Sequence, residues 1–131
     1  MILVNLDCID LEKKNNPEEE TALMMASRVG HVKAVEILVE KNVNVNARTL
    51  DDVTPLICAC VCEQLTIVEI LLNSDGIEIN AQDDDGWTAL IYAVWHGKIK
   101  VVKNLTEQDD LDLDLKNAGD RTALDIASDE R

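Results

Sequence analysis

Aromatic side chains are scarce in this chain of 131 residues, which holds two tryptophans, one tyrosine and no phenylalanine. Proteins that bind single-stranded nucleic acid stack the bases on several aromatic side chains, and this chain has too few of them. Basic residues are also few, with 12 Lys and Arg against 26 Asp and Glu, which gives a net charge of −14. Because that charge repels phosphate groups, the composition argues against binding of nucleic acids and of anionic membranes.

Long apolar runs are missing as well. No segment approaches the ~20 apolar residues of a membrane span, and the N-terminal MILVNLD has no basic flank, so it is not a secretory signal. Three of the four cysteines lie together in CACVC, which is too clustered for a disulfide framework. These absences predict a reduced, intracellular protein, most simply a cytoplasmic one. Hydrophobic residues make up 47% of the chain, which is enough for one domain with a buried core.

A six-residue pattern recurs four times in the chain. TALMMA begins at Thr21, TPLICA at Thr54, TALIYA at Thr88 and TALDIA at Thr122, so the threonines are 33, 34 and 34 residues apart. Two further patterns keep the same phase: VEILVE, VEILLN and VVKNLT, and after them VNVNAR, IEINAQ and LDLDLK. Three patterns in one phase indicate an internal repeat.

The physical chemistry of one unit can be deduced from these patterns. Threonine is a good N-cap, because its hydroxyl accepts a hydrogen bond from an unpaired backbone N–H, and the following residues place Leu and Ala on one face of a short helix. A second apolar stripe, such as Val35 with Leu38, predicts a second helix, and the alternation in residues 43–46 predicts an extended arm. Neither helix is long enough to be stable alone, so the units must stack.

The repeat resembles the ankyrin family, whose signature is a 33-residue period with T-P-L-H-x-A. Thr54-Pro55-Leu56, the DGWT of residues 85–88 and Gly30-His31 match the family pattern, whereas Met24, Ile57, Ile91 and Asp125 replace its signature histidine. The resemblance implies an all-α repeat solenoid of stacked helix-turn-helix units with projecting β-hairpin arms.

A single ankyrin-repeat domain is expected over residues 1–131. Its predicted units are a partial leading repeat at 1–15, full repeats at 16–48, 49–82 and 83–116, and a partial last repeat at 117–131. The chain thus starts and stops in mid-unit, as a fragment of a longer array or a small protein with abbreviated caps would.

No catalytic, cofactor-binding or metal-binding residues are predicted, so the chain is not expected to be an enzyme. Cys58 and Cys60 have the wrong spacing for a zinc site and are interpreted as small buried hydrophobic residues. The DDDG of residues 83–86 fails as a calcium loop, because Ala81 and Tyr92 stand where acidic ligands are needed. His31 and His96 match no nucleophile motif.

By resemblance to the family, a partner protein would bind in the concave groove lined by the arm tips and the ends of the first helices. The candidate contact residues are Trp87, Trp95, Asp85, Asp84, Asp51, Val53, Leu50, His96 and Cys62. Tryptophan is enriched among interface hot spots, and acidic tips would steer a basic partner segment toward the groove. Two alternatives stay open: Trp87 only shields the base of its arm, and the acidic residues only keep the surface soluble.

Other functions are also compatible with the repeats. The last unit lacks its second helix, so Leu124, Ile126 and Ala127 have less cover, and the chain could be a self-assembling or domain-swapped structural protein. A monomer or a weak end-to-end oligomer is expected. The repeats could equally belong to a larger multidomain regulator. Asn46 and Asn80 resemble the asparagine-hydroxylation sites of the family.

Overall fold

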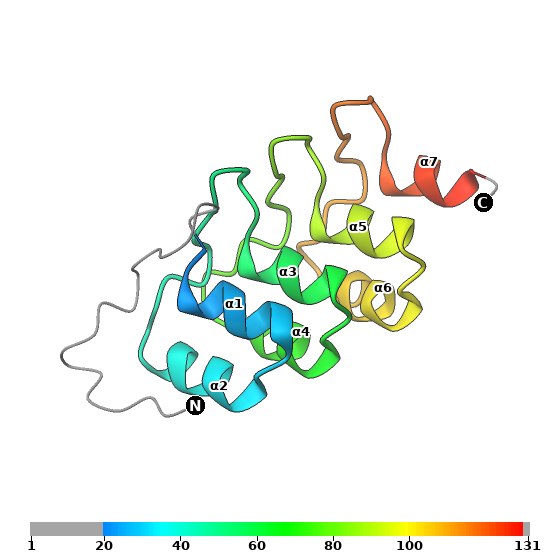
Figure 1. The fold of residues 1–131 in the computed structure, drawn as a ribbon. Coiled ribbons are helices and arrows are strands. Elements are labelled where there is room, and N and C mark those ends of the chain that lie inside the picture. Colours follow the sequence, from blue (N-terminus) through cyan, green and yellow to red (C-terminus); the bar gives the residue numbers. More distant parts are fainter. Residues whose placement is uncertain (1–19, 130–131) are drawn as a thin grey trace.

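The computed structural model describes residues 20–129, which form seven helices arranged in two rows (Figure 1). The helices are α1 (Ala22–Val29), α2 (Val32–Glu40), α3 (Pro55–Val61), α4 (Leu65–Leu72), α5 (Ala89–Trp95), α6 (Ile99–Thr106) and α7 (Ala123–Ser128). One row stacks α1, α3, α5 and α7, and the other stacks α2, α4 and α6. This arrangement confirms the predicted all-α repeat solenoid. The predicted partial repeat at residues 1–15 lies outside the described residues.

Each helix of the first row begins at one of the repeated threonines, as the sequence predicts. The Thr54 hydroxyl accepts a hydrogen bond from the backbone N–H of Ile57 at 3.2 Å, and Thr21, Thr88 and Thr122 cap their helices in the same way. Two of the residues that replace the family's histidine complete the cap. Met24 Sδ and an Asp125 carboxylate oxygen each accept a hydrogen bond from the N–H of the capping threonine, so both form capping boxes.

The core lies between the two rows of helices and runs through the described units. The leucine two residues after the threonine is buried in the first three units, at Leu23, Leu56 and Leu90. Its equivalent Leu124 is 73% exposed, because no helix follows α7 within the described residues to cover it. The expectation of reduced cover is therefore confirmed for Leu124, and for Ala127, which is also exposed, but it is wrong for Ile126, which is buried in the core where α7 packs on α5.

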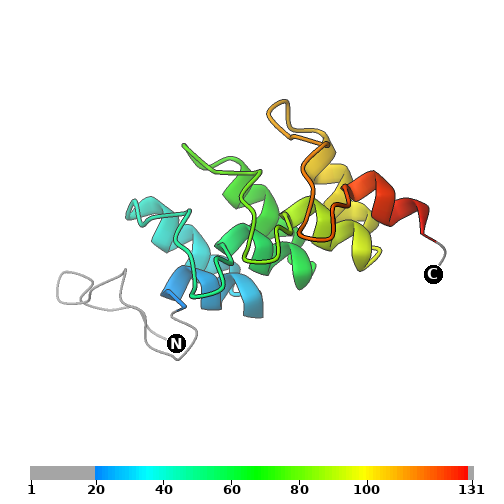
Figure 2. The same cartoon turned by 90° about the horizontal axis from the view of Figure 1, so that it is seen from above.

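The arms project from one side of the stack as turn-closed loops (Figures 1 and 2). The prediction of β-hairpins is not confirmed, because no strand occurs in residues 20–129. Each tip is closed by a backbone hydrogen bond, from Thr49 N–H to the Val53 carbonyl in one arm and from Asp83 N–H to the Trp87 carbonyl in the next. One further bond, from Asp84 N–H to the Asp51 carbonyl, joins these two tips. A single bond between tips does not make a ladder.

Two asparagine side chains join successive arms at their other end. The Asn46 amide donates to the Gly76 carbonyl at 2.8 Å, and its oxygen accepts from the Glu78 N–H at 2.9 Å. Asn80 makes the same two bonds to the backbone of residues 110–112. The structure therefore assigns both asparagines to the spacing of the arms, and their hydroxylation stays a prediction.

Alanine substitution of two glycines is expected to destabilise the protein to different extents. Gly76 and Gly86 both have φ of +75°, but a Cβ on Gly76 would meet no atom, whereas one on Gly86 would lie 2.9 Å from Asn117 Cα. Gly76→Ala should cost about 1 kcal/mol of unfolding free energy for its left-handed backbone. Gly86→Ala should cost about 2 kcal/mol more, because two arm tips must separate. Urea denaturation measures both, and equal losses would show that the clash relaxes freely.

Candidate functional site

All three aromatic side chains of the protein gather in one place, at the tip before α5 and on α5 itself. The Trp87 ring centroid lies 4.9 Å from that of Tyr92 and 5.6 Å from that of Trp95, with the two tryptophans in a T-shaped arrangement. The His96 ring stacks nearly parallel to Tyr92 at 6.4 Å. We call Trp87, Tyr92, Trp95 and His96 the aromatic cluster. Trp95 is 39% exposed, His96 is exposed and Trp87 is half-buried, so the predicted partial exposure of both tryptophans is confirmed.

Asp83 fixes the position of this cluster. Its carboxylate accepts hydrogen bonds from the backbone N–H of Asp85 at 3.0 Å, from that of Trp87 at 2.9 Å, and from the Tyr92 hydroxyl. Partial burial of the phenol and the adjacent carboxylate together raise the pKa of Tyr92. Only 8% of Asp83 is exposed, so the side chain is a buried support of the tip and not a free acidic group.

Neither Asp83 nor Tyr92 was predicted from the sequence to be a member of the site. The repeat does carry a signal for Asp83, since Thr49 and Asn117 occupy its position in the neighbouring units. Thr49 Oγ1 accepts from the N–H of Asp51 and Val53, and Asn117 Oδ1 makes the equivalent two bonds. At this position of every described tip, a side-chain oxygen therefore accepts two backbone hydrogen bonds. Nothing in the repeat singles out Tyr92.

In three of the four units, the residue before the capping threonine contacts the residue eight positions later, at the end of the helix. In the first unit this pair is Glu20 and Arg28, joined by two hydrogen bonds of 3.1 and 3.0 Å. In the last it is Arg121 and Asp129, which also form an ion pair. Charged pairs thus flank the surface at both ends of the described row.

Between these ion pairs the same two positions are apolar. They hold Val53 and Val61 in the second unit and Trp87 and Trp95 in the third. Val53, Val61 and Trp87 pack against the core and stay partly exposed. We call these four residues the central patch. An apolar centre with a charged rim is the usual anatomy of a protein–protein interface.

A hollow of about 300 Å³ lies between the two arm tips next to this patch. Its walls are Asp51, Val53, Asp83, Asp84, Asp85 and Tyr92, and we call it the tip hollow. Loss of hydration, followed by the nearby negative charges of Asp52 and Asp51, raises the pKa of the Asp84 carboxyl. Within residues 20–129, no ion pair involves Asp51, Asp84 or Asp85.

The other predicted contact residues lie at the margins of this site. Leu50 is exposed on the tip beside Asp51. Cys62 is exposed after α3, at the position that His96 occupies after α5. The predicted burial of Cys58 and Cys60 is confirmed, and burial raises the pKa of both thiols.

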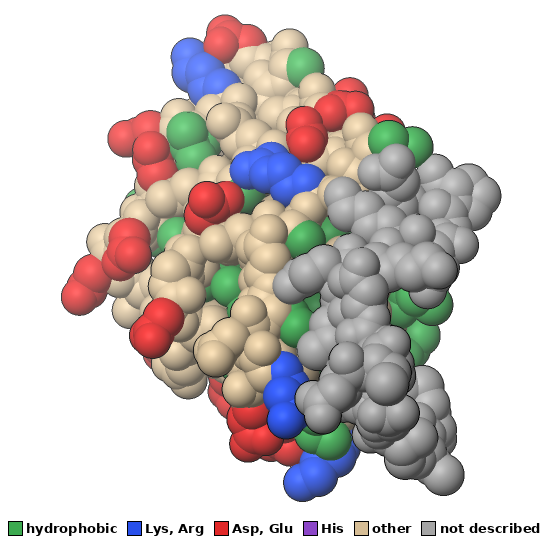
Figure 3. Space-filling view, turned by 90° about the vertical axis from the view of Figure 1, so that its left-hand side faces the viewer, with side chains coloured by type: hydrophobic (Ala, Val, Ile, Leu, Met, Phe, Trp, Pro, Cys, Tyr) green, Lys and Arg blue, Asp and Glu red, His purple; other side chains and the backbone are tan. Residues whose placement is uncertain are grey.

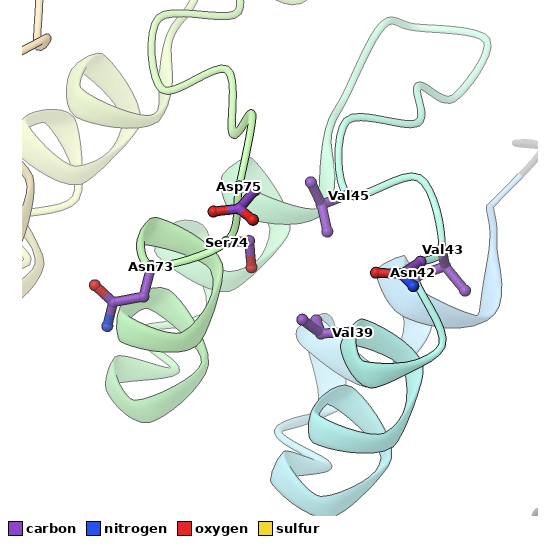
Figure 4. Close-up of a pocket in the computed structure, with 7 residues that line it drawn as sticks. All are labelled: Val39, Asn42, Val43, Val45, Asn73, Ser74 and Asp75. Carbon is purple, nitrogen blue, oxygen red and sulfur yellow. The ribbon is translucent and has the colours of Figure 1, made fainter.

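A second hollow, which the sequence did not predict, lies on the other row, between the ends of α2 and α4 (Figure 4). It measures about 400 Å³ and is lined by Val39, Asn42, Val43, Val45, Asn73, Ser74 and Asp75. Val39 and Val45 face Ser74 and Asp75 across the opening, whereas Asn73 points away (Figure 4). Asp75 is its one charged lining residue and none of its lining residues is aromatic, so this hollow lacks the combination of an aromatic ring and several carboxylates that marks the tip hollow.

No group of three or more His, Cys, Asp or Glu side chains in residues 20–129 is placed to hold a metal ion. None of the described helices has both the length and the apolar character needed to cross a membrane. Acidic side chains are spread over the face seen from the α1–α2 end, with basic ones between them (Figure 3).

Comparison with known proteins identifies the family. A family model described as ankyrin repeats (3 copies) matches residues 2–83, 51–117 and 76–131. A search of curated proteins gave no match. Because the family matches extend across the chain, the protein belongs to the ankyrin-repeat family, whose members are generally non-catalytic protein–protein interaction modules.

Proposed function

We propose that this protein binds a partner protein on the face formed by its arm tips and the α1, α3, α5 and α7 row, which we call the groove face, and that it catalyses no reaction. The observation that carries the proposal is the aromatic cluster, which brings every aromatic side chain of the protein to one partly exposed place. Tryptophan and tyrosine are the residue types most enriched among interface hot spots, together with arginine.

The distribution of charge supports the same surface. The central patch lies between the ion pair of Glu20 with Arg28 and that of Arg121 with Asp129. A partner that covers the patch would remove apolar area from water while leaving these charged pairs at the rim. The acidic side chains at the tips would increase the rate of association with a basic segment more than its final affinity.

Trp95→Ala is expected to weaken partner binding by about 2 kcal/mol and to leave folding stability nearly unchanged. The control is Ile99→Ala, which shortens a side chain that is 79% exposed at the start of α6, in the other row of helices and outside the aromatic cluster. Pull-down from cell extract with each variant, followed by calorimetry on the recovered partner, measures the difference. If Trp95→Ala unfolds the protein, or binds the partner as well as Ile99→Ala does, the proposal that Trp95 contacts a partner on the groove face is wrong.

Self-assembly is the second candidate function, and exposed aliphatic side chains favour it. Leu124 on α7, Ile99 on α6 and Leu113 in the loop between these helices are all largely exposed. A second copy covering them would give an end-to-end oligomer. Light scattering over a concentration series separates the two functions, because a partner-binding monomer keeps a constant mass.

We also propose that the repeats have the limits predicted from the sequence and that the protein is intracellular. Full repeats at 16–48, 49–82 and 83–116 each contain one helix pair, and the partial repeat at 117–131 contains α7. The free thiols of Cys58, Cys60 and Cys62 support a reducing, intracellular compartment.

A further inference from the structure

We infer that the partner segment bound on the groove face is extended and carries an arginine two residues from an apolar side chain. The guanidinium occupies the tip hollow, and the apolar side chain covers the central patch. This inference rests on the proposed function, and it specifies the chemistry of the partner.

The tip hollow has negative charge that the described part of the protein does not compensate. Asp83 is committed to its three internal hydrogen bonds, which leaves the exposed carboxylates of Asp51, Asp84 and Asp85. The two guanidinium groups that flank the groove face are themselves committed, Arg28 to Glu20 and Arg121 to Asp129. Within the described residues these three carboxylates have no cationic partner, so a bound segment can supply one.

The shape and the walls of the hollow favour arginine over lysine. About 300 Å³ is room for a planar guanidinium together with part of its aliphatic stem. Arginine can bond two carboxylate oxygens at once and stack on an aromatic ring, and it sheds water more readily than an ammonium group. The lining supplies the carboxylates, on Asp84 and Asp85, and Tyr92 adds an aromatic wall beside them.

The apolar side chain of the partner segment is inferred from the position of Val53. This residue belongs both to the lining of the tip hollow and to the central patch. Because the two subsites share this wall, one short segment can reach both of them. In an extended segment, residues i and i+2 point to the same side and lie about 7 Å apart. The Trp87 and Trp95 rings and Val61 then form the floor for the apolar side chain.

Three synthetic nine-residue peptides test this inference, each with Gly and Ser flanks around Arg-Gly-Leu, Lys-Gly-Leu or citrulline-Gly-Leu. Both tryptophans of the protein lie in the proposed site, so their fluorescence reports binding directly. The arginine peptide should bind about tenfold more tightly than the citrulline peptide, which keeps the shape but lacks the charge, and more tightly than the lysine peptide. Equal affinities for arginine and citrulline would overturn the inference, as would an arginine peptide that does not saturate at about 1 mM.

A pair of double variants separates the tip hollow from general charge. Asp84→Asn with Asp85→Asn should weaken the arginine peptide at least about fivefold and leave the citrulline peptide unchanged. The control, Asp109→Asn with Asp110→Asn, removes the same charge from two exposed residues that follow α6. Equal weakening by both double variants would overturn the inference. If the peptides show no arginine preference while Trp95→Ala still abolishes capture of the partner protein, the inference fails and the proposed function stands.

Discussion

Replacement of Asp83 by alanine is expected to cost about 3 kcal/mol of unfolding free energy, because three hydrogen-bond donors lose their acceptor. These donors are the N–H groups of Asp85 and Trp87 and the hydroxyl of Tyr92. Water can reach the tip only in part, since Asp83 is buried. The same change should loosen the aromatic cluster, so partner binding should weaken along with stability.

Asp83→Asn is the matched variant for this experiment. An asparagine oxygen can accept the two backbone hydrogen bonds, as Asn117 does in the next tip with Gly119 and Arg121. Asp83→Asn should therefore keep most of the stability that Asp83→Ala loses, as measured by urea denaturation at neutral pH. If the two variants lose equal stability, the negative charge of Asp83, and not its capacity to accept these bonds, holds the tip.

The helical part of the fold could be predicted because it depends on short-range signals that recur. A capping threonine followed by Leu and Ala on one face specifies the start of a helix within a few residues, as at Thr54 and Thr88. Because the pattern repeats every 33 or 34 residues, the helices identified in one unit predict the positions of the helices in the others. The partial exposure of Trp95 followed from the same phase.

The remaining features depend on contacts between units or on side-chain geometry. Tyr92 joins the site because its hydroxyl reaches Asp83 and its ring lies between Trp87 and His96. No local pattern contains this information. The arms were expected to be β-hairpins because their residues alternate, but alternation does not state how many bonds neighbouring arms exchange. The structure provides too few of these bonds for strands, and asparagine side chains such as Asn46 supply the remaining links between arms.

The pairs of residues eight positions apart show why function was harder to predict than fold. Glu20 with Arg28 and Trp87 with Trp95 occupy equivalent positions but have unrelated chemistry. The repeat conserves the place of the pair, because the backbone fixes it, and leaves the side chains free to vary. The chemistry of the groove face therefore depends on residues that differ between the units. A periodic pattern identifies only the residues that the units share.

Alkaline pH is expected to unfold the protein because of two buried thiols. Cys60 lies in the core, and Cys58 packs with Met24 and Ala47 between neighbouring units. Burial, aided by the negative charge of Glu20, raises the pKa of Cys58 to about 12, and burial also raises that of Cys60. In the unfolded chain both thiols ionise at about pH 8.5.

The sign of the effect follows from this difference. Below the unfolded pKa both states hold the thiol protons, and the stability that the thiols contribute is fully present. As the pH rises toward the folded pKa values, the unfolded chain releases two protons that the folded protein retains, so unfolding becomes more favourable. By about pH 10.5 each thiol should have cost about 2 to 3 kcal/mol, or about 5 kcal/mol together, which is comparable to the whole stability of many domains.

Stability measured by urea denaturation from pH 7 to pH 10.5 tests this prediction. The variant with Cys58→Ala and Cys60→Ala should start less stable, because it loses buried sulfur atoms, and should then lose much less stability as the pH rises. Cys62→Ala is the matched control, since Cys62 is exposed, and its profile should follow that of the unmodified protein. Alkylation of the folded protein with iodoacetamide at pH 8, mapped by mass spectrometry, should modify Cys62 and spare Cys58 and Cys60. An unchanged pH profile in the double variant would assign the alkaline transition to other groups, Tyr92 first among them, because the pKa of its phenol is also raised in the folded protein.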